Sequence, residues 1–339
     1  MFTLYTTEDK LTELCLEGEE WFDIIRNQST ICVCNNSENE EWDVTNATLM
    51  ALHRSGTSIE VDNELLEEIK EDNSKVLDLV NPAYILDFKA EEAKAIEEKY
   101  GVIFLPTSNT PKPVLAKRGW DIDTADNGKP NTWDFFLKGN KVNFHSLVIV
   151  DRYFFSTQTG ETFEDSLFNL RMILNALLPA VNVHKFTVSI VFDESKSDYS
   201  MQELATKVNK VKKNIIGKTP FTLELISIDS NCYMYEETHD RFIISNYFVI
   251  NASHKIKAFN AQQKSLCAQK LTFDYLYSKG IEEDDISSIP EVSQNRVLKA
   301  LCDTVQTSMS EIQYAANGQV NKKNGVFTVQ NDLLLVHLD

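Results

Sequence analysis

Long apolar runs are missing from this chain of 339 residues. No stretch approaches the ~20 consecutive apolar residues that a membrane-spanning helix needs. The first ten residues, Met1 to Lys10, also lack a basic segment followed by an apolar one, which is the pattern of a secretory signal. We therefore expect a cytoplasmic protein without a membrane span.

Paired cysteines are missing as well. The six cysteines are scattered, with no C-x2-C pair and no matching histidine pattern. They predict reduced, buried thiols rather than a disulfide framework or a zinc site. We expect neither a metal nor a cofactor.

Several widespread catalytic motifs are also missing. The sequence contains no Walker A motif and no G-x-G-x-x-G, H-E-x-x-H or G-x-S-x-G pattern. The common nucleotide-binding, dinucleotide-binding, metalloprotease and hydrolase functions therefore have no support.

Charge is present, but it is unevenly distributed. The whole chain carries −18, and residues 1 to 135 alone contain 28 acidic against 12 basic residues. Nucleic-acid affinity depends largely on Lys and Arg at phosphates, so an acidic first half would repel a polyanion. Any nucleic-acid contact should use residues 135 to 339, whereas residues 1 to 105 would suit a basic protein partner.

The first 105 residues predict an acidic α/β domain. A buried strand over Ala83 to Asp87, a helix over Ala90 to Tyr100 and a strand over Val102 to Leu105 form a β-α-β pattern, with Gly101 as the helix C-cap. This pattern favours a parallel sheet. Upstream, the hydrophobic pattern predicts a strand over 29–34 and helices over 46–54 and 63–69.

Residues 106 to 134 predict an irregular linker. Pro106, Pro111, Pro113 and Pro130 are interleaved there with Asn, Thr, Gly and Asp. Such a segment resists regular structure, and a loop of this length is uncommon inside a compact domain. We therefore expect a boundary here and a second domain over residues 135 to 339.

The second domain begins with alternating strands and helices. The pattern predicts strands over 146–154, 186–192 and 221–226, separated by helices over 169–178 and 200–211. Further along the chain, helical spacing covers 261–278 and 294–312, and residues 326–329 and 333–336 suggest a small hairpin.

The most informative motif follows the third of these strands. It reads His239-Asp240-Arg241-Phe242-Ile243-Ile244-Ser245-Asn246, and Ser253-His254 come six residues later. Side chains alternate along a strand, so His239 and Arg241 would project from one face. An imidazole beside a guanidinium can hold a phosphate.

This spacing resembles the H-x-K-x4-D-x6-G-S signature of the phospholipase D superfamily. Arg241 stands in place of Lys, Asn246 in place of Asp, and Ser253-His254 where Gly-Ser would stand. The H-D-R variant is most similar to the phospholipase D-like C-terminal domain that accompanies MIT domains. The strand ending in Asp151-Arg152-Tyr153 looks like the family's opening strand, which ends in D-P-Y, so the resemblance covers residues 145 to 260. It implies a mixed-sheet domain with flanking helices.

The resemblance also implies roles for individual residues. In active members of the superfamily, His attacks phosphorus to form a phosphohistidine, which would make His239 the catalytic residue if this chain is active. Only one motif is recognisable, so a second His would have to come from a homodimer partner. Replacing Lys by Arg preserves phosphate binding, whereas losing the Asp changes how a neighbouring imidazole is oriented and charged.

Binding therefore survives more easily than turnover. The residues expected to bind a phosphate-bearing ligand are Arg241, Asn246, Ser253, His254, Asp151, Tyr153 and Lys255. Within this group Asp151 would orient Arg241 or His239, and Tyr153 would supply a hydroxyl at the pocket wall.

Three functions stay open on the sequence. The first is a phospholipase D-like binding module, whose resemblance implies an accessory or sensor role in a bacterial conflict or phage-defence system. The second is a metal-independent homodimeric phosphodiesterase or nuclease with His239 as nucleophile. The third is an interaction protein that uses its acidic N-terminal domain.

Two purely structural interpretations also stay open. His239 and Arg241 can simply pair with carboxylates such as Asp151 and stabilise the fold. The lysines at 207, 210, 212, 213 and 218 can dock a phosphate or form a solvated helix face.

Overall fold

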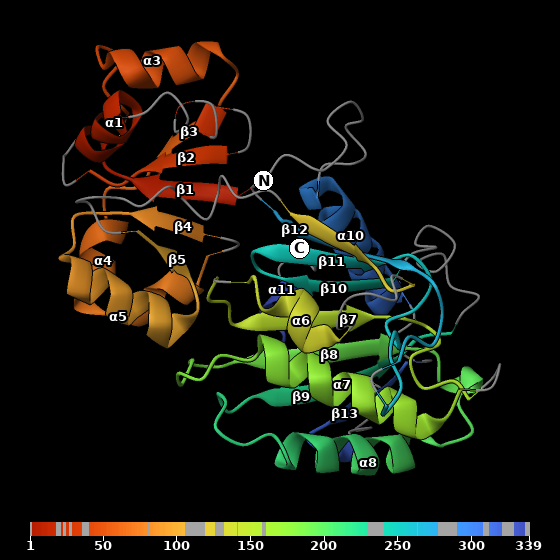
Figure 1. The fold of residues 1–339 in the computed structure, drawn as a ribbon. Coiled ribbons are helices and arrows are strands. Elements are labelled where there is room, and N and C mark those ends of the chain that lie inside the picture. The colour runs from red at the N-terminus through yellow and green to blue at the C-terminus, as the bar shows by residue number, and fades with distance from the viewer. Residues whose placement is uncertain are drawn as a thin grey trace. The chain divides into compact units, whose positions relative to one another are not determined.

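The computed structural model describes most of the chain (Figure 1). The described residues are 2–17, 22, 25–26, 29–35, 41–79, 82–105, 119–125, 132–140, 142–157, 161–229, 241–262, 264–276, 290–307, 312–320 and 329–335. The chain is mixed α/β with two sheets, as the sequence predicts.

Two compact units make up the chain. The first comprises Met1–Lys117, Val142–His145 and Tyr275–Ser278. The second comprises Arg118–Lys141, Ser146–Asp274 and Lys279–Asp339. Two short later segments are thus part of the first unit, an arrangement that a single boundary in the sequence does not describe.

The sheet of the first unit has five strands, and every neighbouring pair is parallel. The strand order is β3-β2-β1-β4-β5. The strands are β1 (Phe2–Thr6), β2 (Ser29–Val33), β3 (Ile59–Val61), β4 (Pro82–Ile85) and β5 (Ile103–Phe104). The predicted parallel sheet is confirmed, but its central strand, β1, was not among the predicted elements.

Helical segments connect these strands. They are α1 (Glu8–Glu17), α3 (Ala47–Arg54), α4 (Leu65–Glu71), the 3₁₀ helix η1 (Asn73–Leu77) and α5 (Ala90–Tyr100). The side chain of Asn46 accepts hydrogen bonds from the backbone N–H groups of Thr48 and Leu49, which fixes the start of α3. Gly101 ends α5 in the left-handed conformation, with φ 64°, as predicted for its C-cap.

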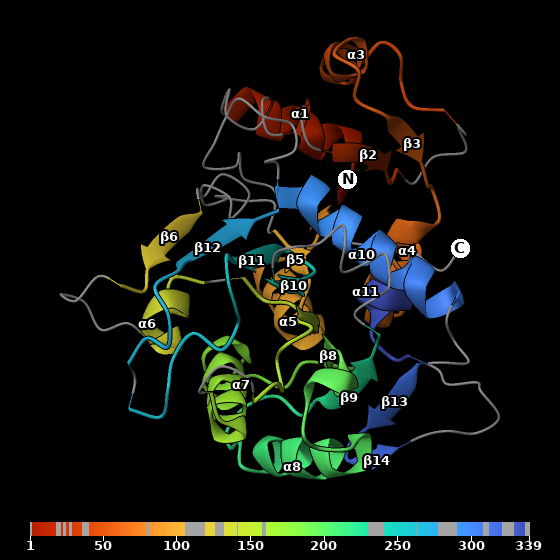
Figure 2. The ribbon, with the colours of Figure 1, turned by 90° about the vertical axis from the view of Figure 1, so that its right-hand side faces the viewer.

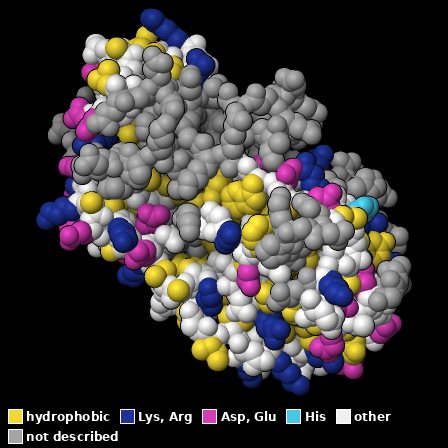
Figure 3. Space-filling view, in the orientation of Figure 1, with side chains coloured by type: hydrophobic (Ala, Val, Ile, Leu, Met, Phe, Trp, Pro, Cys, Tyr) yellow, Lys and Arg dark blue, Asp and Glu magenta, His cyan; other side chains and the backbone are white. Residues whose placement is uncertain are grey.

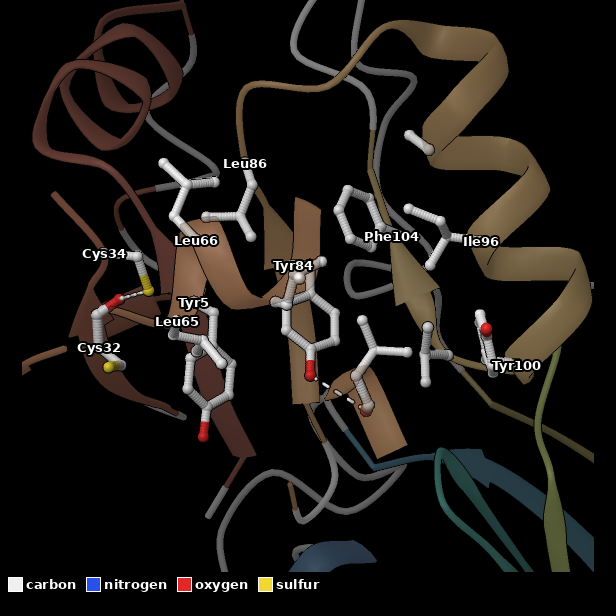
Figure 4. Packing of buried hydrophobic residues seen from close by; sticks show 14 residues of the cluster. Tyr5, Cys32, Cys34, Leu65, Leu66, Tyr84, Leu86, Ile96, Tyr100 and Phe104 are labelled. Atoms are coloured by element: carbon white, nitrogen blue, oxygen red, sulfur yellow. Dashed lines mark hydrogen bonds between the residues drawn. The ribbon is translucent and has the colours of Figure 1, made fainter. Parts of the chain in front are cut away.

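One face of this sheet packs against α4, η1 and α5. Tyr84 lies between Tyr5 and Phe104, with ring centroids 5.3 and 5.2 Å away, and its hydroxyl donates to the carbonyl of Val76 (Figure 4). Because side chains alternate along a strand, Leu4 points to the opposite face. The two faces of the sheet therefore contribute to two separate layers of the core.

The sheet of the second unit has nine strands in the order β14-β13-β9-β8-β7-β10-β11-β12-β6. The bounds are β6 (Trp120–Asp123), β7 (Ser146–Val150), β8 (Thr187–Phe192), β9 (Thr222–Ser227), β10 (Arg241–Ser245), β11 (Phe248–Ala252), β12 (Lys270–Tyr275), β13 (Gln313–Ala316) and β14 (Gln319–Val320). Strands β7, β8 and β9 are parallel, whereas β10 runs antiparallel to β7. The sheet is therefore mixed.

Helices cover both faces of this sheet. Figure 2 shows α6 (Trp133–Leu137) and α7 (Phe163–Leu177) on one face, and α10 (Pro290–Thr307) and α11 (Asp332–Leu335) on the other. Helix α8 (Met201–Lys213) contacts α7 and lies beside β9 and β13. Every residue of β7 and β8 is buried, as expected for strands that are covered on both faces.

The predicted order of strand, helix, strand, helix, strand and motif strand is confirmed by β7, α7, β8, α8, β9 and β10. Three other predictions were wrong. Trp120–Asp123 is a strand paired with β12 rather than part of an irregular linker. The predicted helix over 261–278 contains β12 instead, in which Leu271, Phe273 and Tyr275 are buried at a period of two.

The third error concerns the predicted C-terminal hairpin. Residues 332–335 form α11, because the side chain of Asn331 accepts a hydrogen bond from the backbone N–H of Leu333 and begins a helical turn. Residues 326–328, the other half of that hairpin, lie outside the described residues. Within the part of the chain that is described, no helix has the length and apolar character needed to cross a membrane.

Candidate anion-binding site

The two halves of the predicted motif meet at one end of the nine-stranded sheet. Strand β7 ends at Val150, and Asp151 follows it directly. Strand β10 is antiparallel to β7, with Phe242 opposite Val150, so its first residue, Arg241, lies beside Asp151. The sheet register therefore brings together two residues that are 90 positions apart in the sequence.

Asp151 holds three segments together through its buried carboxylate. Its Oδ1 accepts a hydrogen bond from the backbone N–H of Tyr153 at 2.9 Å, and its Oδ2 accepts one from Ile256 at 3.0 Å. The Nε of Arg241 lies 3.8 Å from Oδ1, so the pairing considered in the sequence analysis is present. Burial raises the pKa of Asp151, while the Ile256 N–H and the Arg241 charge act in the opposite direction.

Tyr153 carries two guanidinium groups near its ring. The centre of the Arg152 guanidinium lies 4.7 Å from the ring centroid, and that of Arg241 lies 5.8 Å away. Both distances fall within the range of cation–π attraction. The ring therefore helps to hold positive charge at this end of the sheet.

A cavity of about 470 Å³ opens beside Tyr153. The described residues that line it include Tyr153, Ser156, Glu161, His254, Lys255, Lys257, Cys267 and Ala268. Three residues that the sequence predicted for the site are among them, namely Tyr153, His254 and Lys255. Arg241 is not a lining residue but reaches the site through its contact with Tyr153.

A lysine at the cavity wall is almost completely buried. The side chain of Lys257 is 1% exposed, and its Nζ lies 2.6 Å from Glu161 Oε2. The same ammonium donates a hydrogen bond to the backbone carbonyl of Ser156 at 2.5 Å. Lys255 pairs with the other carboxylate oxygen of Glu161. One carboxylate therefore serves two ammonium groups.

Basic side chains outnumber acidic ones in the ion pairs that the described residues form at this end of the sheet. Lys255, Lys257 and Arg241 contribute three positive charges, whereas Glu161 and Asp151 contribute two negative ones. Lys257 is the most deeply buried of the three, and burying an ammonium group is costly unless negative charge compensates it. These five residues therefore form an electrostatic environment that favours an anion.

Gln269 fixes the loop that carries the two cavity lysines. Its Oε1 accepts hydrogen bonds from the backbone N–H groups of His254 and Lys255, at 3.1 and 2.9 Å. Its Nε2 donates to the carbonyl of Lys255 at 2.8 Å. The loop is thus tied to the neighbouring β12 segment, and the imidazole of His254 is carried at the cavity wall.

The structure places Asn246 at the opposite end of β10 from Arg241. Asn246 follows the far end of β10, where its side-chain oxygen accepts a hydrogen bond from the backbone N–H of Ser146 at 2.9 Å. Asn246 lies five positions beyond Arg241 along the strand, which corresponds to roughly 16 Å. Its buried amide joins the start of β7 to the β10–β11 turn instead of contacting a ligand beside Arg241.

Ser253 also has a different role from the predicted one. Its hydroxyl oxygen accepts from the backbone N–H of Lys270 at 3.2 Å, and its own N–H donates to the Lys270 carbonyl. These hydrogen bonds pair Ser253 with β12. Ser253 is not among the residues named above as lining the cavity beside Tyr153. His239 lies outside the described residues. Its predicted role as the catalytic nucleophile therefore stays a prediction.

The sequence analysis did not include Glu161, Ser156, Lys257 or Gln269 among the expected ligand-binding residues. The period of two was the one available signal for Lys257, because it places Lys255 and Lys257 on the same side of an extended segment. Glu161 belongs to no recognisable sequence motif. Only tertiary contacts place it at the cavity.

No group of three or more His, Cys, Asp and Glu residues in the described part of the chain is arranged to hold a metal ion. No protein-family model, curated protein or solved structure matches this chain.

Proposed function

We propose that the second unit binds a phosphate-bearing ligand in the cavity beside Tyr153. The observation that carries this proposal is the cluster of Lys255, Lys257 and Arg241 beside Glu161 and Asp151, in which the side chain of Lys257 is only 1% exposed. Guanidinium and ammonium groups are the usual protein partners of phosphate oxygens. The cavity volume of about 470 Å³ falls within the range of small-ligand pockets.

A metal-independent phosphodiesterase is the second candidate, because Arg241 contacts Tyr153 at the cavity wall and His239 precedes Arg241 by two residues in the sequence. This function requires the His239 imidazole as nucleophile and a second histidine from a homodimer partner. The phospholipase D resemblance, including the accessory or sensor role in bacterial conflict, supports both candidates as an expectation only.

Equilibrium binding tests the first candidate. The probes are a short fluorescein-labelled single-stranded oligonucleotide and inorganic phosphate, the latter as a competitor, at low and at physiological salt. Arg241→Ala should weaken binding roughly tenfold or more, since a charge-assisted hydrogen bond is worth about 1.5–3 kcal/mol. Lys270→Ala removes one positive charge from an exposed pair with Asp121 in the same unit and should leave affinity within about twofold.

Binding that is absent, or that falls equally in Arg241→Ala and Lys270→Ala, would overturn the proposal. Hydrolysis of bis-p-nitrophenyl phosphate in chelator separates the second candidate from the first. Turnover that is lost in His239→Ala would establish the phosphodiesterase, whereas phosphate-competed binding without turnover would support a binding module.

A further inference from the structure

A second hollow lies between helices α7 and α8, away from the cavity beside Tyr153. Its volume is about 430 Å³. Leu167 and Phe168 of α7 and Val211 of α8 supply apolar lining. Helices α7 and α8 contact each other directly, so this groove follows a helix pair that belongs to one unit.

Positive charge surrounds the apolar lining. Arg171 is one turn beyond Leu167 on α7, and on α8 Lys207 is one turn before Val211 and three residues before Lys210. Residues three and four apart lie on one helix face, so each helix presents its cations beside its apolar residues. Figure 3 shows Lys and Arg side chains with hydrophobic atoms between them over this part of the second unit.

The ammonium group of Lys207 lies over two aromatic rings. Its Nζ lies 4.7 Å from the Tyr199 ring centroid and 5.3 Å from that of Phe163. Over the described residues, none of Arg171, Lys207 and Lys210 forms an ion pair with a carboxylate. This distinguishes the groove from the cavity, where Glu161 forms ion pairs with two lysines.

We infer that this groove docks an acidic, amphipathic segment of a partner protein. Carboxylates of the segment contact Arg171, Lys207 and Lys210, and an apolar side chain packs on Leu167, Phe168 and Val211. This is the helix-in-groove mode of peptide recognition, in which apolar anchors give affinity and charge complementarity gives register.

Two observations favour a protein segment over a nucleic acid. The apolar lining between the cations matches a hydrophobic anchor, which a phosphodiester backbone does not offer. Glu164 lies at the same groove and would repel a continuous row of phosphates.

The test uses three labelled synthetic peptides and the full-length chain. The first peptide repeats Glu-Leu-Leu-Glu, the second replaces its Leu by Ser, and the third replaces its Glu by Lys. We expect only the first to bind measurably, and the Arg171→Glu and Lys210→Glu double variant to weaken it roughly tenfold or more. Lys213→Glu is the matched control, because it reverses a charge on α8 without being one of the groove residues named here.

Phe168→Ala tests the apolar half of the inference and should weaken the first peptide several-fold, with unfolding curves confirming that each variant is folded. Equal binding to all variants, or equal losses in the double variant and in Lys213→Glu, would overturn the inference. Two further outcomes would overturn the inference: preferential binding of a single-stranded oligonucleotide, and self-association of the chain. Either outcome counts if the double variant abolishes it and Phe168→Ala leaves it unchanged. Arg241→Ala should not change peptide binding, so this test fails or succeeds independently of the phosphate proposal.

Discussion

Lys257 and Glu161 form a buried ion pair in which Nζ and Oε2 are 2.6 Å apart. Their side chains are only 1% and 9% exposed, and Lys255 contacts the same carboxylate. Removing two charges from water is costly, so such a pair adds little stability compared with apolar residues. Breaking it, however, leaves a buried charge without a partner.

Glu161→Gln should therefore destabilise the second unit by roughly 3–5 kcal/mol, the usual cost of breaking a buried pair. Urea unfolding followed by fluorescence measures this loss. Asp121→Asn, which breaks the exposed pair with Lys270, should cost less than ~1 kcal/mol. Similar losses in the two variants would contradict the buried character of the Lys257 pair.

Gly101→Ala should destabilise the first unit more than Gly56→Ala does. Both glycines have positive φ, 64° and 93°, and a side chain in that region costs roughly 1–2 kcal/mol. A Cβ at Gly101 would also lie 2.4 Å from the carbonyl oxygen of Phe144, whereas nothing lies within 4 Å of a Cβ at Gly56. Thermal unfolding compares Gly56→Ala, which introduces backbone strain alone, with Gly101→Ala, which adds a steric clash. Equal decreases in melting temperature would show that the backbone near Phe144 moves to relieve the clash.

Glu97 should make the stability of the protein depend on pH. Burial raises the pKa of its carboxyl to about 7 from 4.5. Between these two values the folded state keeps a proton that the unfolded state has lost, so stability should fall as pH rises from 4.5 to 7. Glu97→Gln should remove this dependence and stabilise the protein at neutral pH. Urea midpoints of both proteins across this range provide the measurement, and parallel profiles would count against the prediction.

Tyr314 should contribute more through its hydroxyl than Tyr84 does. The Tyr314 hydroxyl donates at 2.6 Å to the buried carboxylate of Glu224, which also accepts from Ser189 and Gln330. Tyr314→Phe should cost about 1.5–3 kcal/mol, and Tyr84→Phe, whose acceptor is the neutral carbonyl of Val76, about 0.5–1.5 kcal/mol. The free energies of unfolding from denaturant titrations compare the two variants, and the reverse order would contradict a charged acceptor at Glu224.

Local signals explain what could be predicted of the fold. Asn46 and Gly101 mark helix ends through contacts within a few residues, and the apolar periods of the segments from Ser146 to Ser245 indicate the order of strands and helices. The failures also have a local cause. The apolar residues of Lys270–Tyr275, which alternate along a strand, were interpreted as helical spacing. The four residues of β6 were not predicted as a strand, because prolines and polar residues surround them in the sequence.

The candidate site was predicted in outline only. Tyr153, His254 and Lys255 line the cavity, and Arg241 lies beside Tyr153, because they occupy the ends of elements that the sequence indicates. Asn246 was misplaced because the motif says nothing about the direction in which a strand carries its later residues. Glu161 carried no signal, since nothing around it in the sequence differs from an ordinary solvent-exposed glutamate.

By itself, the sequence determined the mixed α/β class, the acidic first half and the alternation of strands and helices, because propensity, capping and charge act over short distances along the chain. The tertiary structure alone decided that β1 is the central strand of its sheet and that Glu161 forms ion pairs with both Lys255 and Lys257. It also decided that Arg171, Lys207 and Lys210 lie around one groove. These relationships arise from strand order and helix packing, which join residues that are far apart in the sequence.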